Sequence, residues 1–420
     1  MAATAPARPD ARTMARDFDL ARPPAGFIDD PFPFYAALRR HAPVKQLGEN
    51  SWLLTRHADL ERVYKDTALF SSDKREEFRP KFGDGYLYRH HTSSLVFNDP
   101  PLHTRVRRIL AGALTPRAVE ALEGDVETLV DGLLDAMAEK TSAGEPVDLI
   151  ADFAAAIPVE VIGNMLDVPR DERGPLRDWS LAILGALEPV LSAEQFQRGE
   201  EAVRDFLTYL ETLVARRRAR PGDPERDMLS RLIIGEADGG KLGHEELLQQ
   251  CVFILNAGHE TTTNLIGNGL ELLDRFPGER ARLLADPSLI RTAVEEILRY
   301  ESSNQLGNRA ATAPVRFGAI DMPAGARLTL CIGAANRDCD VFDEAERFDI
   351  ARKPNRHLAF ASGAHQCIGM NVARLEGRIA ILRFVRRFPH YRLLRPAVHS
   401  PRIRFRGFSA IPAVLEGNIA

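Results

Sequence analysis

The sequence predicts a mainly α-helical fold with small antiparallel β-sheets. Apolar side chains recur at helical spacing over long stretches, most clearly across 119–137. The stretch 244–276 has the same character and greatly exceeds the mean helix length of about 11–12 residues. Across 315–330 the apolar period shortens towards two, which is typical of strands. Because no internal repeat and no separating linker interrupts the chain, we expect one large domain.

The same patterns predict the remaining elements. Residues 52–55 are predicted as a strand and 402–415 as a closing hairpin. Residues 71–98 lose their periodicity amid charges, glycines and aromatic side chains, so we expect a long irregular loop there. Further helices are predicted at 31–40, 58–65, 150–166, 176–187, 193–219, 227–234 and 289–300, together with one opened by Asp99.

Composition narrows the possible functions. The 420 residues are 45% hydrophobic and 27% charged, an ordinary globular balance. The net charge of −4 argues against a nucleic-acid binder, and no apolar run reaches the ~18 residues of a membrane span. Four cysteines without a CxxC pair suggest neither disulfides nor a zinc site and fit a reducing cytoplasm. Residues 1–30 lack an apolar signal core and are predicted to form a disordered lead to a domain spanning 31–420.

A loop of small residues at 360–369 contains one cysteine. It has the sequence Phe-Ala-Ser-Gly-Ala-His-Gln-Cys-Ile-Gly, and a helical pattern follows it. Cys367 therefore lies near a helix N-terminus, where free amide N–H groups and the positive end of the helix dipole favour a thiolate. The alternative is a buried free cysteine in a turn, which is the commoner situation for an average cysteine.

The spacing Phe-x-x-Gly-x-His-x-Cys-x-Gly resembles the haem-ligand loop of the cytochrome P450 family. The resemblance implies that Cys367 is the thiolate ligand of the iron in haem b. It also implies that Phe360, Gly363 and Gly369 belong to the cofactor loop. Ala361 departs from the pattern, because the family usually has Gly or a small polar residue there, and we expect the loop to tolerate this change.

A second motif lies in the middle of the long predicted helix, where residues 257–262 are Ala-Gly-His-Glu-Thr-Thr. Gly258 inside a helix costs about 1 kcal/mol relative to Ala, and Thr261 can bond back to a carbonyl and open the helix locally. The alternative is a surface acid followed by ordinary helical threonines. The hexapeptide is similar to the family's oxygen-activation motif. That similarity implies that Gly258 leaves room for dioxygen while Glu260 and Thr261 relay protons.

Glu296 and Arg299 stand three residues apart on one helical face. Most such pairs lie on the surface and contribute ~0–1 kcal/mol. The match to the family's Glu-x-x-Arg helix implies instead a buried pair, joined by Arg352, that braces the thiolate loop.

His103 and Arg107 are one helical turn apart and therefore point the same way. A solvated helix start is the alternative. The resemblance implies that these two residues, with Arg309 and His365, contact the haem propionates. The helix after Cys367 also carries a row of arginines that would suit an acidic electron carrier: Arg374, Arg378, Arg383, Arg386 and Arg387.

Together these motifs imply a soluble, bacterial-type haem-thiolate monooxygenase. It would insert one atom of dioxygen into a small or medium organic substrate, by hydroxylation or oxidative dealkylation. No Gly-x-Gly-x-x-Gly fingerprint follows a strand, so we expect electrons from a separate ferredoxin or flavodoxin-type donor with its NAD(P)H reductase. We expect a cytoplasmic monomer that binds neither nucleic acid nor membrane. Two alternatives stay open: a peroxide-driven enzyme, and a non-catalytic haem-binding or sensor protein.

The substrate pocket is expected, by position in the family pattern, between the 71–97 loop, the 176–196 helices and the 304–307 segment. Its candidate residues are Asn256, Ala257, Gln305 and Phe408. Because two of these are amides where the family often has aliphatic residues, we expect Asn256 and Gln305 to hold a polar group of the substrate. The alternative is that both amides bond to backbone or water.

Overall fold

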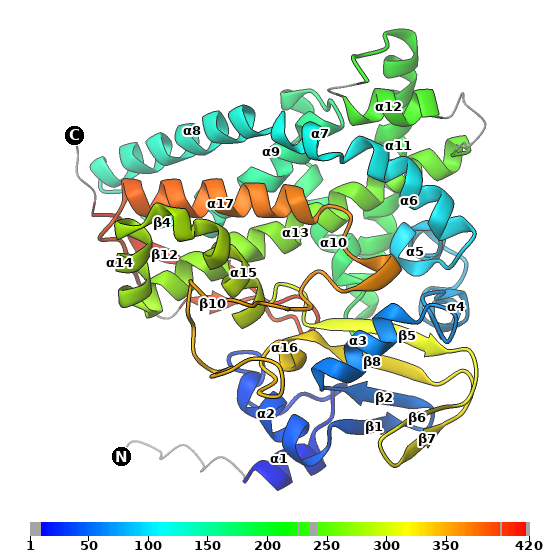
Figure 1. The fold of residues 1–420 in the computed structure, drawn as a ribbon. Helices are drawn as coiled ribbons and strands as arrows, with labels where there is room; N and C mark the ends of the chain where they lie inside the picture. The colour runs from blue at the N-terminus through cyan, green and yellow to red at the C-terminus, as the bar shows by residue number, and fades with distance from the viewer. Residues whose placement is uncertain (1–9, 225–226, 236–241, 395–396, 417–420) are drawn as a thin grey trace.

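The computed structural model describes residues 10–224, 227–235, 242–394 and 397–416 (Figure 1). Helices fill the upper part of the molecule in this view, and a sheet with the N-terminal segment lies below them. The fold is mainly helical with small sheets, as predicted. The principal helices are α2 (Phe32–His41), α3 (His57–Lys65), α6 (Leu102–Ala113), α8 (Glu123–Ser142), α9 (Ala156–Met165), α10 (Leu176–Gly185), α11 (Ala193–Ala219), α13 (His244–Arg275), α15 (Ile290–Tyr300) and α17 (Met370–Arg387).

Helix α13 is the element on which the helical part is built. Most of its side chains are buried, and polar residues such as Gln249, Asn264 and Asn268 are buried along with the apolar ones. Helices α9, α10, α11, α15 and α17 all pack against it. Gly269 allows α17 to approach closely, because a Cβ at that position would lie 2.6 Å from Ile381 Cδ1. The shorter helices are α7 (Pro116–Glu120), α12 (Met228–Gly235), α14 (Pro277–Ala285) and α16 (Ile332–Ala335), with a π-turn at Ile150–Ala154 and 3-10 turns at Arg170–Glu172 and Pro287–Leu289.

The main sheet has five strands in the order β1-β2-β8-β5-β3. All neighbours are antiparallel except β2 and β8, which run parallel with Leu54 opposite Leu330. The predicted strand region 315–330 thus divides in two. Its first half forms a separate hairpin and its second half joins the main sheet. The strands are β1 (Val44–Gly48), β2 (Ser51–Leu54), β3 (Phe70–Ser71), β5 (Leu306–Ala311), β6 (Val315–Phe317), β7 (Ile320–Met322) and β8 (Arg327–Cys331).

The prediction of a disordered lead is wrong for residues 10–30; residues 1–9 lie outside the described part of the chain. Helix α1 (Ala11–Asp17) starts at Asp10, whose side chain accepts hydrogen bonds from the amides of Arg12 and Thr13. Phe18 and Phe27 are buried together with side chains of α2. The overall composition of the segment did not predict this ordered structure, because a few aromatic side chains are enough to pack a short segment against α2.

The predicted irregular loop at 71–98 is also wrong. It contains α4 (Arg75–Phe82), α5 (Tyr86–Ser93) and a 3-10 turn (Leu95–Phe97). The aromatic rings of Phe78, Phe82 and Phe97 pack with the His91 ring, so tertiary contacts hold these short helices together. Charged side chains cover their outer faces and hide the helical period in the sequence.

The predicted hairpin at 402–415 does not form. Its two strands, β11 (Phe408–Ala410) and β12 (Pro412–Val414), pair with partners outside the segment. Strand β11 pairs with β10 (Val398–His399), and β12 lies between β4 (Val147–Asp148) and β9 (Arg392–Leu393). The two strands are adjacent in the sequence, which suggested that they pair with each other through a turn. In the structure each of them pairs with strands from other parts of the chain.

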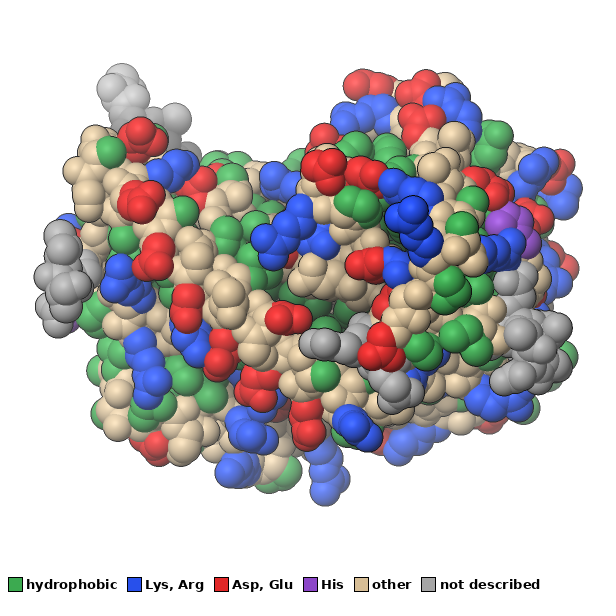
Figure 2. Space-filling model, turned by 90° about the horizontal axis from the view of Figure 1, so that it is seen from above, with side chains coloured by type: hydrophobic (Ala, Val, Ile, Leu, Met, Phe, Trp, Pro, Cys, Tyr) green, Lys and Arg blue, Asp and Glu red, His purple; other side chains and the backbone are tan. Residues whose placement is uncertain are grey.

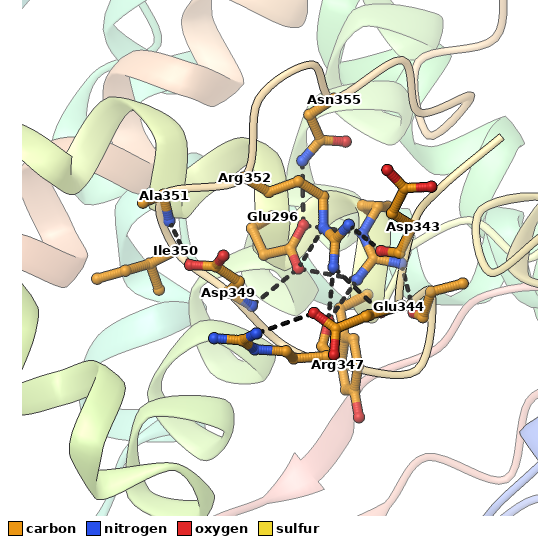
Figure 3. A network of polar contacts seen from close by, with 12 residues as sticks. Glu296, Asp343, Glu344, Arg347, Asp349, Ile350, Ala351, Arg352 and Asn355 are labelled. Atoms are coloured by element: carbon orange, nitrogen blue, oxygen red, sulfur yellow. Dashed lines mark hydrogen bonds and ion pairs between the residues drawn. The ribbon is translucent and has the colours of Figure 1, made fainter. Parts of the chain in front are cut away.

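The three predicted brace residues meet in one buried network, shown in Figure 3. Glu296 accepts hydrogen bonds from Arg299 at 2.8 Å and from Arg352 at 3.1 Å. Arg299 is fully buried and also donates to the carbonyls of Asn336, Ala345 and Arg347.

The network extends to the loop that contains Cys367. Asn336 accepts the amide of Leu358 at 2.7 Å through its side chain, just before the 360–369 loop begins. The Glu296 carboxylate also accepts the amide of Asp349 and the side-chain amide of Asn355. One buried carboxylate therefore organises the irregular segment that leads into the loop.

We expect the Arg299→Met substitution to lower the free energy of unfolding by about 3–5 kcal/mol, because it removes one partner of a buried ion pair and the donor to three carbonyls. The matched control is Arg316→Met in the Arg316–Asp321 pair, whose side chains are 68% and 69% exposed. That change is expected to cost about 0–1 kcal/mol. Chemical denaturation followed by circular dichroism measures both, and equal small losses would contradict a bracing role.

Candidate functional site

The 360–369 loop passes between helix α3 and the start of α17. The amide of Cys367 donates to the carbonyl of Phe360 at 2.9 Å, and a 3-10 turn at Gly363–His365 lies within this closed loop. Gly363 adopts φ +68°, and a Cβ there would overlap the Tyr64 carbonyl oxygen and lie 3.2 Å from Lys65 Cα. Only glycine fits this position without a shift of α3, because both φ and the neighbouring backbone exclude a side chain.

Ala361 is the residue that departs from the family pattern, and the structure explains why glycine is usual there. Its φ is 55°, in the left-handed region that L-residues with a Cβ adopt at a cost of about 1–2 kcal/mol. The loop nevertheless closes, with the amide of Ala361 bonded to the carbonyl of Leu358 at 2.8 Å. The departure changes the stability of the loop and leaves its course intact.

The Cys367 side chain is accessible to solvent, yet it is surrounded by protein. Burial raises the pKa of the thiol, while the amide of Gly369 and the charges of Arg107 and Arg374 oppose that rise. From this combination of accessibility and desolvation we infer that the thiol faces an interior space. Arg374 is held in place by Glu295 at 2.7 Å.

The four basic side chains predicted to contact the haem propionates interact electrostatically with one another, and Arg107 also acts on this thiol. The rings of His103 and His365 lie 3.9 Å apart, and the Nε2 atom of each is buried without a hydrogen-bond partner among the described residues. Burial, followed by the charge of Arg107, lowers the pKa of His103. Burial and then Arg309 lower the pKa of His365 to about 3.

Arg309 and Arg107 carry the positive charge of this group. Arg309 is 6% exposed, and among the described residues its side chain donates a hydrogen bond only to the Asn308 carbonyl. Within the described ranges neither arginine forms an ion pair, and burial lowers the pKa of both. Two buried imidazoles with free Nε2 atoms and two unpaired guanidiniums fit a dianionic ligand. A haem, with two propionates and an iron that takes a thiolate, fits this set of residues.

The 257–262 motif lies on α13, which remains a continuous helix through it. Thr261 Oγ1 donates to the Ala257 carbonyl at 2.8 Å, so the expected back-bond forms, but it does not open the helix. Ala257 is exposed although most of α13 is buried, which places it on the same interior space. Gly258 faces away from that space, because a Cβ there would lie 2.7 Å from Ile162 Cδ1 of α9. Its small size serves packing, in contrast to the expected room for dioxygen.

Glu260 is buried and paired with Arg402, whose Nη1 lies 2.7 Å from its Oε2. Burial raises the pKa of Glu260 to about 7, and the Arg402 charge opposes part of this rise. Consecutive helical residues point in different directions, so the Glu260 carboxylate and the Thr261 hydroxyl do not bond directly. Sequence reasoning missed Arg402. The repeated arginines at 402, 404 and 406 were a signal, but their partners depend on tertiary contacts.

The predicted pocket amides are engaged by protein neighbours. Gln305 is 1% exposed and donates to the Ser302 carbonyl at 2.6 Å. Asn256 Nδ2 lies 3.3 Å from His90 Nε2. Phe408 stacks on His399 and lines a separate cavity of about 460 Å³ with Arg275, Glu301 and Arg406. Of the four candidates, Ala257 alone is exposed.

The arginine row on α17 is largely neutralised. Arg383 pairs with Glu127 and Asp131 of α8, and Arg387 pairs with Asp135. Figure 2 shows Lys and Arg side chains interspersed with Asp and Glu over the upper face, without one continuous basic patch. Arg374, Arg383 and Arg387 are therefore paired with acids, while Arg386 is exposed, so less positive charge is free for an acidic electron carrier than the sequence suggested.

Comparison with known proteins matches these features to one family. The cytochrome P450 family model matches residues 42–395. Cytochrome P450 107B1 of Saccharopolyspora erythraea is 36% identical, with 93% of this chain and 94% of the relative covered. The vitamin D(3) 25-hydroxylase of Pseudonocardia autotrophica is also 36% identical, with 93% and 94% covered.

A solved structure agrees. The structure of P450BioI in complex with an acyl carrier protein that carries hexadec-9Z-enoic acid has a TM-score of 0.85 and 31% identity, and the match covers 93% of this chain and 99% of that one. No helix among the described residues is long and apolar enough to cross a membrane. The match along nearly the whole length of its relatives shows that this chain belongs to the cytochrome P450 family and is a haem-thiolate monooxygenase with haem b as its cofactor.

Proposed function

We propose that Cys367 supplies the iron ligand and that His103, Arg107, Arg309 and His365 hold the two propionates. The observation that supports this best is the accessible but desolvated thiol beside four basic groups without acidic partners. Bound haem supplies the oxidising chemistry, because a thiolate ligand donates electron density and favours O–O cleavage. Phe360 and Gly363 position the thiol by closing the loop, and Gly369 donates its amide to the sulfur.

We also propose that Glu260 and Thr261 bring protons to the interior space. The Glu260 carboxyl, with a pKa of about 7, accepts and releases a proton readily near neutral pH. Arg402 holds this carboxylate at Oε2, so Glu260 must leave Arg402 to reach the Thr261 side of α13. Thr261 Oγ1, bonded to the Ala257 carbonyl, presents its lone pairs to a proton donor. The buried surroundings limit the entry of bulk water, which would otherwise waste the activated oxygen.

As a member of the family, the enzyme uses an organic substrate, dioxygen and electrons from a redox partner. We propose a ferredoxin or flavodoxin-type donor with its NAD(P)H reductase, acting on a monomeric enzyme in the cytoplasm. The free state of all four cysteines supports the location. Relatives include a vitamin D(3) hydroxylase, and a solved relative holds a hexadecenoic acid on its carrier protein. A small or medium organic molecule, hydroxylated or oxidatively dealkylated, is the proposed substrate.

The ligand assignment is tested by the reduced, carbon monoxide-bound difference spectrum. We expect the red-shifted band of a thiolate ligand in the parent protein, and its loss in Cys367→Ser. Cys339→Ser changes an exposed cysteine and is expected to leave the band unchanged. An unchanged band in Cys367→Ser would overturn the assignment. A normal band without turnover by any reductase system would favour the sensor alternative.

We expect Gly363→Ala to lower haem content and to cost more than about 2 kcal/mol of stability, because the new Cβ meets the backbone of α3 as well as an unfavourable φ. Haem content per protein chain and thermal unfolding measure the effect. Gly318→Ala is the control, since Gly318 has φ +59° with no atom near the added Cβ. It should cost about 1 kcal/mol and keep the haem, whereas Ala361→Gly should raise stability by up to about 1 kcal/mol. Equal effects at 363 and 318 would contradict the steric explanation.

We expect Arg402→Gln to raise the pKa of Glu260 above about 7, because the cation that favours the carboxylate is removed. An infrared pH titration of the protonated carboxyl group measures this, with the signal assigned by its absence in Glu260→Gln. In the parent protein this signal should fade as pH rises through about 7, and in Arg402→Gln only at higher pH. Arg316→Gln removes an exposed charge and should leave the titration unchanged. A coincident titration in the parent and Arg402→Gln would show that the pair is not functional.

A further inference from the structure

Arg404 is fixed by its backbone in the segment that precedes β11. Its amide donates to Glu188 Oε2 at 3.2 Å, and its carbonyl accepts the amide of Gln305 at 2.8 Å. The preceding residue, Ile403, donates to the same Glu188 oxygen at 2.9 Å. The main chain at Arg404 is thus held from two sides, which restricts where the side chain can point.

The side chains of Arg402 and Arg406 have partners, whereas the side chain of Arg404 has none among the described residues. Arg402 pairs with Glu260 and donates to the Leu181 carbonyl. Arg406 binds Glu301 and the carbonyls of Ile28 and Asp29. Across the residues that the structure describes, no hydrogen bond or ion pair reaches the guanidinium of Arg404. Its five N–H donors are therefore available.

This guanidinium is enclosed but accessible, like the thiol of Cys367. Burial lowers the pKa of Arg404, with the charges of Glu188 and Glu77 opposing. The side chain is nevertheless only half-buried, and none of its nitrogens is sealed from solvent. An enclosed group with accessible donors faces a space that water or a ligand can enter.

The acids near Arg404 have other partners, with the exception of Glu188 Oε1, which is buried without a hydrogen-bond partner among the described residues. Glu77 pairs with Lys74 of α4 at 2.8 Å, and Glu188 Oε2 accepts the two backbone amides described above. Lys81 of α4 donates to the Glu188 carbonyl at 2.7 Å. The charges of Lys74, Lys81, Arg309 and Arg404 are coupled to one another, and three carboxylates oppose these four cations: Glu77, Glu188 and Asp99. The region keeps an excess of positive charge.

The position of Arg404 connects this charge to the reaction site. It lies two residues from Arg402, the partner of Glu260 on α13. Its charge also acts on Arg309, one of the four basic groups beside Cys367. Arg404 is therefore connected through its own segment to the helix with the proposed proton donors, and through its charge to the proposed propionate site and to Lys81 of α4.

We propose that Arg404 binds a carboxylate of the substrate, so that the enzyme oxidises organic acids. The proposal rests on the monooxygenase function and specifies its substrate class. A guanidinium binds a carboxylate through two parallel hydrogen bonds, which fixes orientation as well as position. An enclosed cation without a partner is costly, and an anionic substrate offsets that cost only when bound. In this proposal Arg404 takes the recognition role that the sequence assigned to Asn256 and Gln305, whose amide nitrogens bond within the protein while their amide oxygens are buried without a partner among the described residues.

The test compares carboxylic acids with their uncharged primary amides. The ferric holoenzyme is titrated with the linear acids from octanoic to hexadecanoic and with 4-tert-butylbenzoic acid, each against its amide, and the spin-state shift reports binding. We expect at least one acid to bind tenfold or more tightly than its amide. Arg404→Gln should remove that preference while the affinity for the amide stays within about twofold, and Arg404→Lys should retain part of it.

The matched control is Arg75→Gln, which removes an equal charge from the exposed surface of α4 and should keep the preference. No acid binding better than its amide, or an unchanged preference in Arg404→Gln, would overturn the proposal. Loss of haem from Arg404→Gln would overturn it too, because Arg404 would then belong to the propionate site. The carbon monoxide band of the same samples tests the monooxygenase assignment separately: a normal band without a preference for acids rejects only the role of Arg404.

Discussion

The structure depends on holding one sulfur atom in a desolvated place that a ligand can still reach. A flexible loop would let the thiol turn away, and an open one would let water surround it. The loop avoids both, because Gly363 presses against the backbone of α3 and Cys367 bonds back to Phe360. Behind it, the Glu296 carboxylate and its arginines fix the irregular segment that enters the loop. Buried ion pairs add little stability as a class, but they specify one arrangement when every donor and acceptor is satisfied.

The buried charges around this sulfur are of two kinds: some are paired with opposite charges, and others are not. The unpaired ones indicate where ligands bind. In the brace, each buried charge has partners and the network is structural. Near Cys367 and at Arg404, buried or enclosed cations lack acidic partners within the described chain. Because uncompensated buried charge is costly, such places indicate where anionic ligands belong. The four basic groups near the thiol suit a fixed cofactor, whereas Arg404, set apart from them on another segment, suits a molecule that enters and leaves.

Sequence predicted the chemistry better than it predicted the geometry. Cys367, Glu260, Thr261, Glu296 and the basic residues near the thiol could be proposed from the sequence because short motifs constrain residue types at fixed spacing. The helices built on a strong apolar period were also found, α11 and α13 nearly to the residue. The elements that were missed, α1, α4 and the pairing of β11 and β12, are stabilised by contacts with distant segments. The roles of Arg402 and Arg404 were not predicted for the same reason, because no local sequence pattern indicates which distant side chain an arginine will contact.

The stretch Arg-Ile-Arg-Phe-Arg at 402–406 joins three separate tasks in five residues. Arg402 pairs with Glu260 of α13, and Arg404 is half-buried and proposed to bind the substrate. Arg406 bonds to Glu301 and to the N-terminal segment. Deleting or inserting a single residue here would give each guanidinium the wrong neighbour and disturb all three at once. Related enzymes that act on other substrates are therefore expected to differ in this stretch by substitution of single side chains rather than by insertion or deletion. In α4, whose main chain makes fewer contacts with other segments, changes of length are expected to be tolerated better.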